Sequence, residues 1–292
     1  MLQVARLAPK LLGESTPLVL DFFLRQQHPD GGFRDRSGRS DLYYAVFGIE
    51  GLLALQAPLP VSALVDYLGR FQEGSELDFI HLCCLARCRA AVGEKDAPAS
   101  WRSWVQPMRE RLEHFRSGDG GYSVTAGAAR GTAYACFMAL AAYQDLRLSP
   151  PASDRVLACV QTLATPDGAW GNEAGLKAGA TNATAAAITL LRQLRVPPPA
   201  GLAEWLLAQR HPQGGFRAAP NAPLPDLLST ATALHALAGL ERTMGDGRED
   251  CLDFVDTLWS NEGGFHGHWG DDFLDCEYTY YGLLALGHLS LE

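Results

Sequence analysis

Two kinds of apolar stretch alternate along the chain. One kind is amphipathic: within residues 201–210, Leu202, Trp205 and Leu206 recur at helical spacing, whereas Glu204 and Gln209 lie off that stripe. The other kind has almost no polar face, as in YYAVFGIEGLLAL (43–55) and YTYYGLLALGHL (278–289). A helix with one apolar stripe covers a core, and a helix that is apolar all round is itself covered on both sides. The pattern therefore predicts an outer and an inner layer of helices.

Glycines mark this alternation at regular intervals. They fall between each amphipathic stretch and the apolar stretch that follows it, in steps of 43, 46, 48, 46 and 49 residues, at Gly31, Gly74, Gly120, Gly168, Gly214 and Gly263. Steps of this length are typical of helical repeats. We therefore predict an all-α fold, an (α/α)6 toroid of six helix-pair repeats, in a single domain over residues 1–292; an open solenoid is the alternative.

Composition and charge exclude several classes of partner. The net charge of -9 is spread along the chain, which argues against nucleic acid or an anionic membrane surface. The seven cysteines are an odd number and form no pair of CxxC motifs, so we expect reduced thiols. The sequence contains neither an apolar run of about 18 residues nor a clear secretory leader, which predicts a soluble cytoplasmic chain without a membrane span.

Two segments carry a family resemblance. GLAEWLLAQRHPQGGFRAAPNAPLPDLLSTATAL (201–234) and FVDTLWSNEGGFHGHWGDDFLDCEYTYYGLLAL (254–286) resemble the last two repeats of the β subunit of protein prenyltransferases. The wider group includes squalene and oxidosqualene cyclases. The resemblance covers nearly the whole chain and implies an α/α toroid whose central funnel accommodates an isoprenoid.

The same resemblance implies a degenerate metal site. The family holds a catalytic zinc with an Asp, a Cys and a His, and the matching positions here are Asp226, Leu228 and Tyr278. Because leucine cannot ligate a metal and tyrosine rarely binds zinc, the zinc site is predicted to be lost. The family's diphosphate-binding Arg and Lys fall on or near Ala219 and Ala222, whereas Lys177 lies where a diphosphate-contacting His is expected.

The acidic segment DDFLD (271–275) offers a second kind of metal chemistry. Asp271, Asp272 and Asp275 spell a DDxxD motif, in which carboxylates share magnesium ions that bind a diphosphate. The alternative is a solvated loop in which Asp275 caps a helix. A DxDD motif, typical of the cyclases that protonate an alkene, does not precede any of the apolar helices. Asp226 and Asp275 are the candidate catalytic residues, and helix capping is the alternative for each.

The toroid would have a polar rim and an aromatic funnel. If all six inner helices start at the same end, their free amides favour an anionic head group there. Below that rim, aromatic side chains suit a polyprenyl tail or a carbocation, and packing between the two helical layers is the alternative. The candidate substrate-binding residues are Tyr43, Tyr44, Lys177, Trp269, Tyr278 and Tyr281.

These observations predict an isoprenoid-handling enzyme. The leading hypothesis is binding of a prenyl diphosphate, followed by transfer or ionisation, with magnesium as a possible cofactor. The alternatives are a terpene cyclase-like enzyme and a non-catalytic toroid that binds a lipid, a peptide or a protein. We expect a monomer or homodimer that needs no α-type partner subunit.

Overall fold

The computed structural model describes residues 1–93 and 96–291. Within them, six helices form an outer layer: α3 (Thr16–Arg25), α5 (Val61–Gly69), α7 (Ser100–His114), α9 (Ser153–Thr162), α11 (Leu202–Leu207) and α13 (Arg248–Thr257). Six more form an inner layer: α4 (Leu42–Ala54), α6 (Phe79–Val92), α8 (Ala133–Asp145), α10 (Thr181–Gln193), α12 (Leu227–Gly239) and α14 (Cys276–Leu289). Each predicted apolar stretch therefore forms a helix in the predicted layer.

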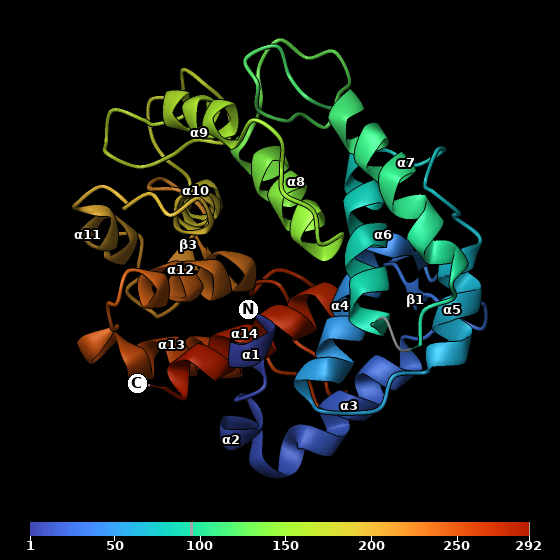
Figure 1. Ribbon diagram of the computed structural model, residues 1–292. Helices are drawn as coiled ribbons and strands as arrows, with labels where there is room; N and C mark the ends of the chain where they lie inside the picture. Colours follow the sequence, from blue (N-terminus) through green and yellow to red (C-terminus); the bar gives the residue numbers. More distant parts are fainter. Residues whose placement is uncertain (94–95, 292) are drawn as a thin grey trace.

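The inner helices close into a ring. Each of them contacts its two neighbours, and the last, α14, packs against the first, α4. Figure 1 shows the outer helices around the periphery of this ring. The closed arrangement confirms the toroid and excludes the open solenoid. It also explains why the inner helices lack a polar face, since each of them is covered by its neighbours and by the outer layer.

The repeated glycine sits where one repeat touches the next. A Cβ atom at Gly31 would lie 2.1 Å from the carbonyl oxygen of Ala63, in the outer helix of the second repeat. A Cβ atom at Gly263 would lie 2.1 Å from the carbonyl oxygen of Leu18, in the outer helix of the first repeat. Both glycines have a positive φ, which other residues adopt at a cost. The last repeat therefore joins the first through the same contact that joins the first to the second.

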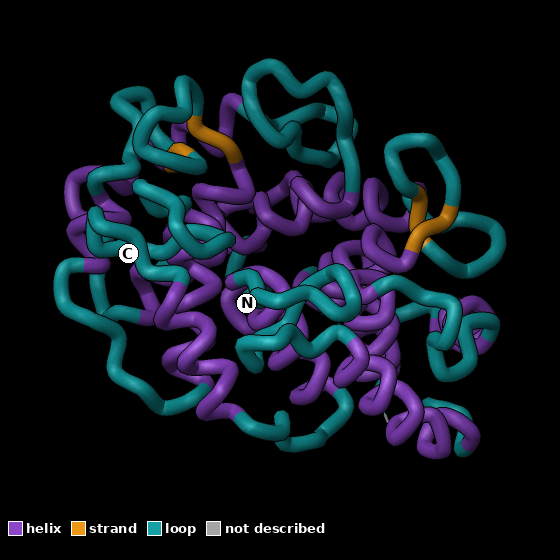
Figure 2. The backbone as a smooth tube through the Cα atoms, turned by 90° about the horizontal axis from the view of Figure 1, so that it is seen from above, coloured by secondary structure: helices purple, strands orange, loops and turns teal. Residues whose placement is uncertain are grey.

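In three repeats an aromatic residue after the turn anchors the loop to its inner helix. Trp170, Phe216 and Phe265 are buried, and each donates its backbone N–H to a threonine hydroxyl 14 residues later, at distances of 3.1, 2.9 and 3.2 Å. In two repeats the loop also forms a short antiparallel pair, β1 (Phe33–Arg34) with β2 (Ser40–Asp41) and β3 (Phe216–Arg217) with β4 (Pro225–Asp226). Figure 2 shows both pairs toward the same edge of the molecule.

The N-terminal segment covers the opposite end of the ring. It contains the short helices α1 (Leu2–Ala5), α2 (Pro9–Leu12) and η1 (Gly13–Ser15). One more short helix, η2 (Gly245–Gly247), lies elsewhere in the chain, directly before α13. Helix α1 contacts α14 and α4, and Arg6 donates from Nε to the carbonyl oxygen of Leu53, at the end of α4, over 3.4 Å. The sequence analysis did not predict this segment, because it is too short to show a helical period.

Charged side chains tie neighbouring inner helices together near both ends of the ring. Near the C-terminal ends, Arg87 of α6 bonds Glu50 of α4 and also donates to Asp145 of α8 over 3.0 Å. Near the N-terminal ends, His81 of α6 lies 2.8 Å from Asp78 and 3.1 Å from Asp41, the residue that precedes α4. Hydrogen bonding to Asp41 and Asp78 raises the pKa of His81 to about 9, so this side chain is a cation at neutral pH.

We predict that this histidine stabilises the ring in a pH-dependent way. Because the pKa of His81 is raised by folding, its contribution is complete below its unfolded value of about 6.5 and is lost as the pH rises through about 9. The variant His81→Asn should lower the melting temperature by about 2 °C at pH 6 and by much less at pH 9.5. Scanning calorimetry at the two pH values measures this difference.

The matched control is His114→Asn, at an exposed position on the outer helix α7. This variant should have the same small effect on the melting temperature at pH 6 and at pH 9.5. An equal loss at pH 6 and pH 9.5 for His81→Asn would show that the side chain acts through packing and not through its charge.

Candidate functional site

Aspartates cap four of the six inner helices at the rim. Each accepts a hydrogen bond from a backbone N–H of the first turn: Asp41 from Tyr43 (2.7 Å), Asp78 from His81 (2.9 Å), Asp226 from Ser229 (2.7 Å) and Asp275 from Tyr278 (2.8 Å). An aspartate before a helix satisfies amides that would otherwise be free and complements the helix dipole. The capping interpretation of these residues therefore describes their geometry.

This capping changes the prediction about an anionic head group. The sequence argument relied on free first-turn amides, but in four helices a carboxylate already accepts from them. The same carboxylates bring negative charge to the rim, which repels a second anion. In four of the six inner helices, an aspartate therefore takes first-turn amides on which the expected anionic rim relied.

Arg36 occupies the centre of the acidic DDFLD segment. This residue comes from the loop of the first repeat, and it donates from Nε to Asp275 over 2.7 Å and from its terminal nitrogen to Asp271 over 2.9 Å. Its guanidinium also lies over the rings of Phe273 and Tyr278, 5.2 and 5.4 Å from their centres. The interaction links the first repeat to the last across the seam of the ring.

The magnesium hypothesis for Asp271, Asp272 and Asp275 stays a prediction, and the structure shows which contacts these carboxylates make within the protein. Asp271 and Asp275 bind the guanidinium, Asp275 is only 2% exposed and also caps α14, and Asp272 is exposed. In residues 1–93 and 96–291 no group of three or more His, Cys, Asp or Glu side chains converges as a metal site. Two of the three predicted magnesium ligands, Asp271 and Asp275, therefore bind the guanidinium of Arg36.

Aromatic side chains of the first and last inner helices form a continuous wall. The ring of Phe47 lies 5.1 Å from that of Tyr43, 5.5 Å from that of Tyr281 and 6.0 Å from that of Tyr280. Tyr44 adjoins Tyr43 at 5.6 Å, and Tyr278 adjoins Tyr281 at 6.5 Å. We call these six residues the aromatic wall; it includes four of the six predicted substrate-binding residues, Tyr43, Tyr44, Tyr278 and Tyr281.

A carboxylic acid stands within this wall. Glu277, in the first turn of α14, accepts a hydrogen bond from the hydroxyl of Tyr43 on α4 over 2.6 Å. Burial raises its pKa to about 7, and the negative charge of Asp275 acts in the same direction. At pH 7 about half of the Glu277 carboxyl groups therefore carry a proton. Tyr134 lies in the first turn of α8 and is 39% exposed. Burial raises its pKa, and the nearby charge of Glu277 acts in the same direction.

The remaining predicted residues lie apart from the wall. Lys177 is exposed in the loop of the fourth repeat. Trp269 packs its ring against Phe254 of the outer helix α13 at 5.6 Å and donates to the hydroxyl of Thr257, so it belongs to the outer layer. Asp226 accepts from both the amide and the hydroxyl of Ser229 at 2.7 Å, and burial raises its pKa. The two predicted catalytic residues, Asp226 and Asp275, are both helix caps.

The sequence analysis missed Glu277, Arg36 and the role of His81. Glu277 lies four residues before Tyr281, on the same face of one helix, and that spacing was a usable signal. Arg36 gives no such signal, because its partners are more than 230 residues away along the chain.

Comparisons with solved structures agree with the fold. The type II terpene cyclase MstE from Scytonema, in complex with its substrate geranylgeranyl dihydroxybenzoate, is 15% identical with a TM-score of 0.64, and 97% of each chain is covered. Protein geranylgeranyltransferase-I from Candida albicans, complexed with GGPP, is 14% identical with a TM-score of 0.50, over 99% of this chain and 81% of that one. A glycosidase is 12% identical with a TM-score of 0.57, over 98% of this chain and 96% of that one. At such identities the likeness shows a shared fold and leaves the reaction open.

Two further findings concern the family and the membrane. A search of curated proteins gave no match. None of the helices in the described residues is long and apolar enough to cross a bilayer. The model of the prenyltransferase alpha-alpha toroid domain matches residues 16–84 and 183–290, which together make up more than half of the chain. The chain therefore belongs to the prenyltransferase alpha-alpha toroid domain family.

Proposed function

We propose that this protein converts an isoprenoid by protonating one of its carbon–carbon double bonds, with Glu277 as the proton donor. This is the terpene cyclase-like alternative of the sequence analysis. The observation that carries it is the pairing of Glu277 with Tyr43 in the aromatic wall, where the pKa of the carboxyl is raised to about 7. An acid with a pKa near the working pH is present in its protonated form and can be reloaded from solvent.

The hydrogen bond from Tyr43 decides which oxygen of Glu277 carries the proton. Burial raises the pKa of Tyr43, so the phenol stays neutral and donates to Oε1. The other oxygen, Oε2, accepts from no side chain in the described part of the molecule and is free to hold the proton. In the proposed step the O–H bond breaks, the electrons of the alkene form a new C–H bond, and a tertiary carbocation results. Attack by a second alkene closes a ring, and loss of a proton gives an isomer of the substrate.

The aromatic wall suits the intermediate of such a reaction. A carbocation is attracted to the negative face of an aromatic ring, and Tyr43, Phe47 and Tyr281 bring three rings close to the acid. The rings also exclude water, which would otherwise capture the cation. The wall therefore supplies both the apolar surface that an isoprenoid tail needs and the stabilisation that its cation needs.

The charge of the rim favours a substrate without a diphosphate. The capping aspartates make the rim acidic, and the cations beside them, Arg36 and His81, are already bound to carboxylates. A diphosphate would have to compete with these carboxylates. The substrate of MstE, geranylgeranyl dihydroxybenzoate, is a precedent for an isoprenoid with another kind of head group. We therefore propose a polyprenyl substrate with an uncharged or weakly charged head.

The proposal predicts deuterium uptake that depends on Glu277. When the protein is incubated in D₂O with geranylgeraniol, geranylgeranyl acetate or squalene, the product should be an isomer that carries one deuteron bound to carbon. Mass spectrometry after gas chromatography detects both properties. The variant Glu277→Gln should lower the rate by at least about 100-fold, because the amide cannot give up a proton to carbon.

The variant should remain folded. Since the pKa of Glu277 is raised, the charged carboxylate costs stability as the pH rises through about 7, so Glu277→Gln should melt no lower than the wild type at pH 8. Glu76→Gln, at an exposed position, is the matched control and should keep full activity. Release of diphosphate from geranylgeranyl diphosphate, without deuterium uptake from any substrate, would reject protonation in favour of ionisation.

A second prediction concerns the pH dependence of this activity. The rate should fall as the pH rises through about 7, where Glu277 loses its proton. The hydrogen bond from Tyr43 stabilises the carboxylate and lowers its pKa, so Tyr43→Phe should move this limb of the pH profile upward by about one pH unit. A lower rate with an unshifted profile would mean that Tyr43 contributes wall area only.

A further inference from the structure

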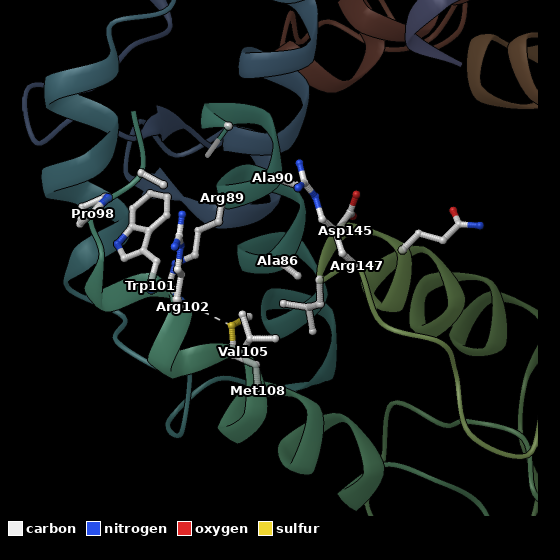
Figure 3. Close-up of a pocket in the computed structure, with 14 residues that line it drawn as sticks. Ala86, Arg89, Ala90, Pro98, Trp101, Arg102, Val105, Met108, Asp145 and Arg147 are labelled. Carbon is white, nitrogen blue, oxygen red and sulfur yellow. Dashed lines mark hydrogen bonds between the residues drawn. The ribbon is translucent and has the colours of Figure 1, made fainter. Parts of the chain in front are cut away.

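A separate cavity lies on the outer side of the inner ring, away from the aromatic wall. It measures about 250 Å³ and opens between α6, α7 and the C-terminal end of α8. Its apolar lining includes Ala86, Ala90, Val105 and Leu146. Three arginines share the lining: Figure 3 shows Arg89 and Arg102 on the side of α7, and Arg147 across from them beside Asp145.

Arg89 is a buried cation that forms no ion pair with a carboxylate in the described residues. Its side chain is 8% exposed, and its guanidinium lies between the rings of Trp101 and Trp104, 5.1 and 4.5 Å from their centres. One terminal nitrogen donates to the backbone carbonyls of Leu68 and Gln72, whereas Nε has no hydrogen-bond partner. Burial lowers the pKa of this arginine to about 10, which shows that its charge is poorly compensated.

The other charged side chains around the cavity do not neutralise the positive charge of Arg89. Asp145 is the acidic residue among the described lining residues, and it is already bound by Arg87 over 3.0 Å. Arg102 is exposed on α7 and adds a second positive charge to the lining. A guanidinium in a partly apolar recess attracts an oxyanion more strongly than one in open solvent, because the local dielectric constant is lower.

We propose that this cavity binds a small organic oxyanion, a carboxylate or a phosphate monoester that carries a short apolar group. The oxyanion faces Arg102 and the field of Arg89, and the apolar group lies against Ala90, Val105 and Leu146. The volume is smaller than that of a pocket for a drug-sized ligand, which limits the apolar part to a few carbon atoms. The site does not depend on the reaction proposed for the aromatic wall, since it shares no residue with it.

The test uses three probes with the same tail and different heads. Isothermal titration calorimetry at low ionic strength compares hexanoate, hexyl phosphate and hexanol. Binding of either anion at least about ten-fold tighter than hexanol supports the oxyanion site, and the stronger of the two identifies the head group. Equal binding of all three probes, or no binding of any, overturns the proposal.

Variants then locate the site. Arg102→Gln should weaken anion binding about ten-fold, whereas Arg109→Gln, an exposed arginine on the same helix outside the cavity, should leave it unchanged. Ala90→Phe fills the cavity from an exposed position and should abolish binding without unfolding the protein. Glu277→Gln should bind the anion like the wild type. Equal losses for Arg102→Gln and Arg109→Gln, or full binding by Ala90→Phe, would show a general surface attraction and reject the site.

Discussion

The packing of the ring depends on the close approach of three turn glycines to the backbone of the next outer helix. At Gly31, Gly214 and Gly263 a Cβ atom would meet a carbonyl oxygen at 2.1, 1.8 and 2.1 Å, so a larger residue would push adjacent repeats apart. The contact of Gly263 falls on the first outer helix, α3, and α14 packs against α4, so the last repeat is joined to the first in both layers. A closed ring needs no capping repeat at either end.

Closure has an electrostatic consequence at the rim. Six helix N-termini meet there, and each leaves backbone amides to be satisfied. This chain satisfies four of them with aspartates, and a ring of carboxylates around a narrow opening is unfavourable unless cations lie between them. Arg36 and His81 are those cations: His81 lies between Asp41 and Asp78 of the first two repeats, and Arg36 of the first repeat binds Asp271 and Asp275 of the last. Glu277 lies just inside this acidic ring, among aromatic side chains, and both conditions favour its protonated form. The acid of the proposed reaction is thus a consequence of how the ring is capped.

The sequence predicted the helices well and the site only in part, for physical reasons. Helical periodicity and glycine spacing are local properties, so they identified both layers and the closed ring. Tyr43, Tyr44, Tyr278 and Tyr281 lie in the first two turns of inner helices, where the helical period brings neighbouring rings together. That they bind a substrate stays a prediction. Lys177 and Trp269 lie in loops, where no period fixes the direction of a side chain, and they point elsewhere. Arg36 reaches partners from the other end of the sequence, a contact that exists only after the ring has closed.

The predicted loss of the zinc ligands and the arginine at the rim both concern the charge at the start of the inner helices. A metal ion supplies positive charge that can hold a diphosphate, but Leu228 and Tyr278 stand at two of the three positions where the family resemblance places its ligands. Here the positive charge beside Tyr278 is the guanidinium of Arg36, which stacks over that ring and is neutralised by Asp271 and Asp275. No excess positive charge is left at this point for a diphosphate. Under the proposed function, an aromatic wall, a neutralised cation and a buried carboxyl with a raised pKa serve proton donation to an uncharged isoprenoid, a chemistry that needs no leaving group.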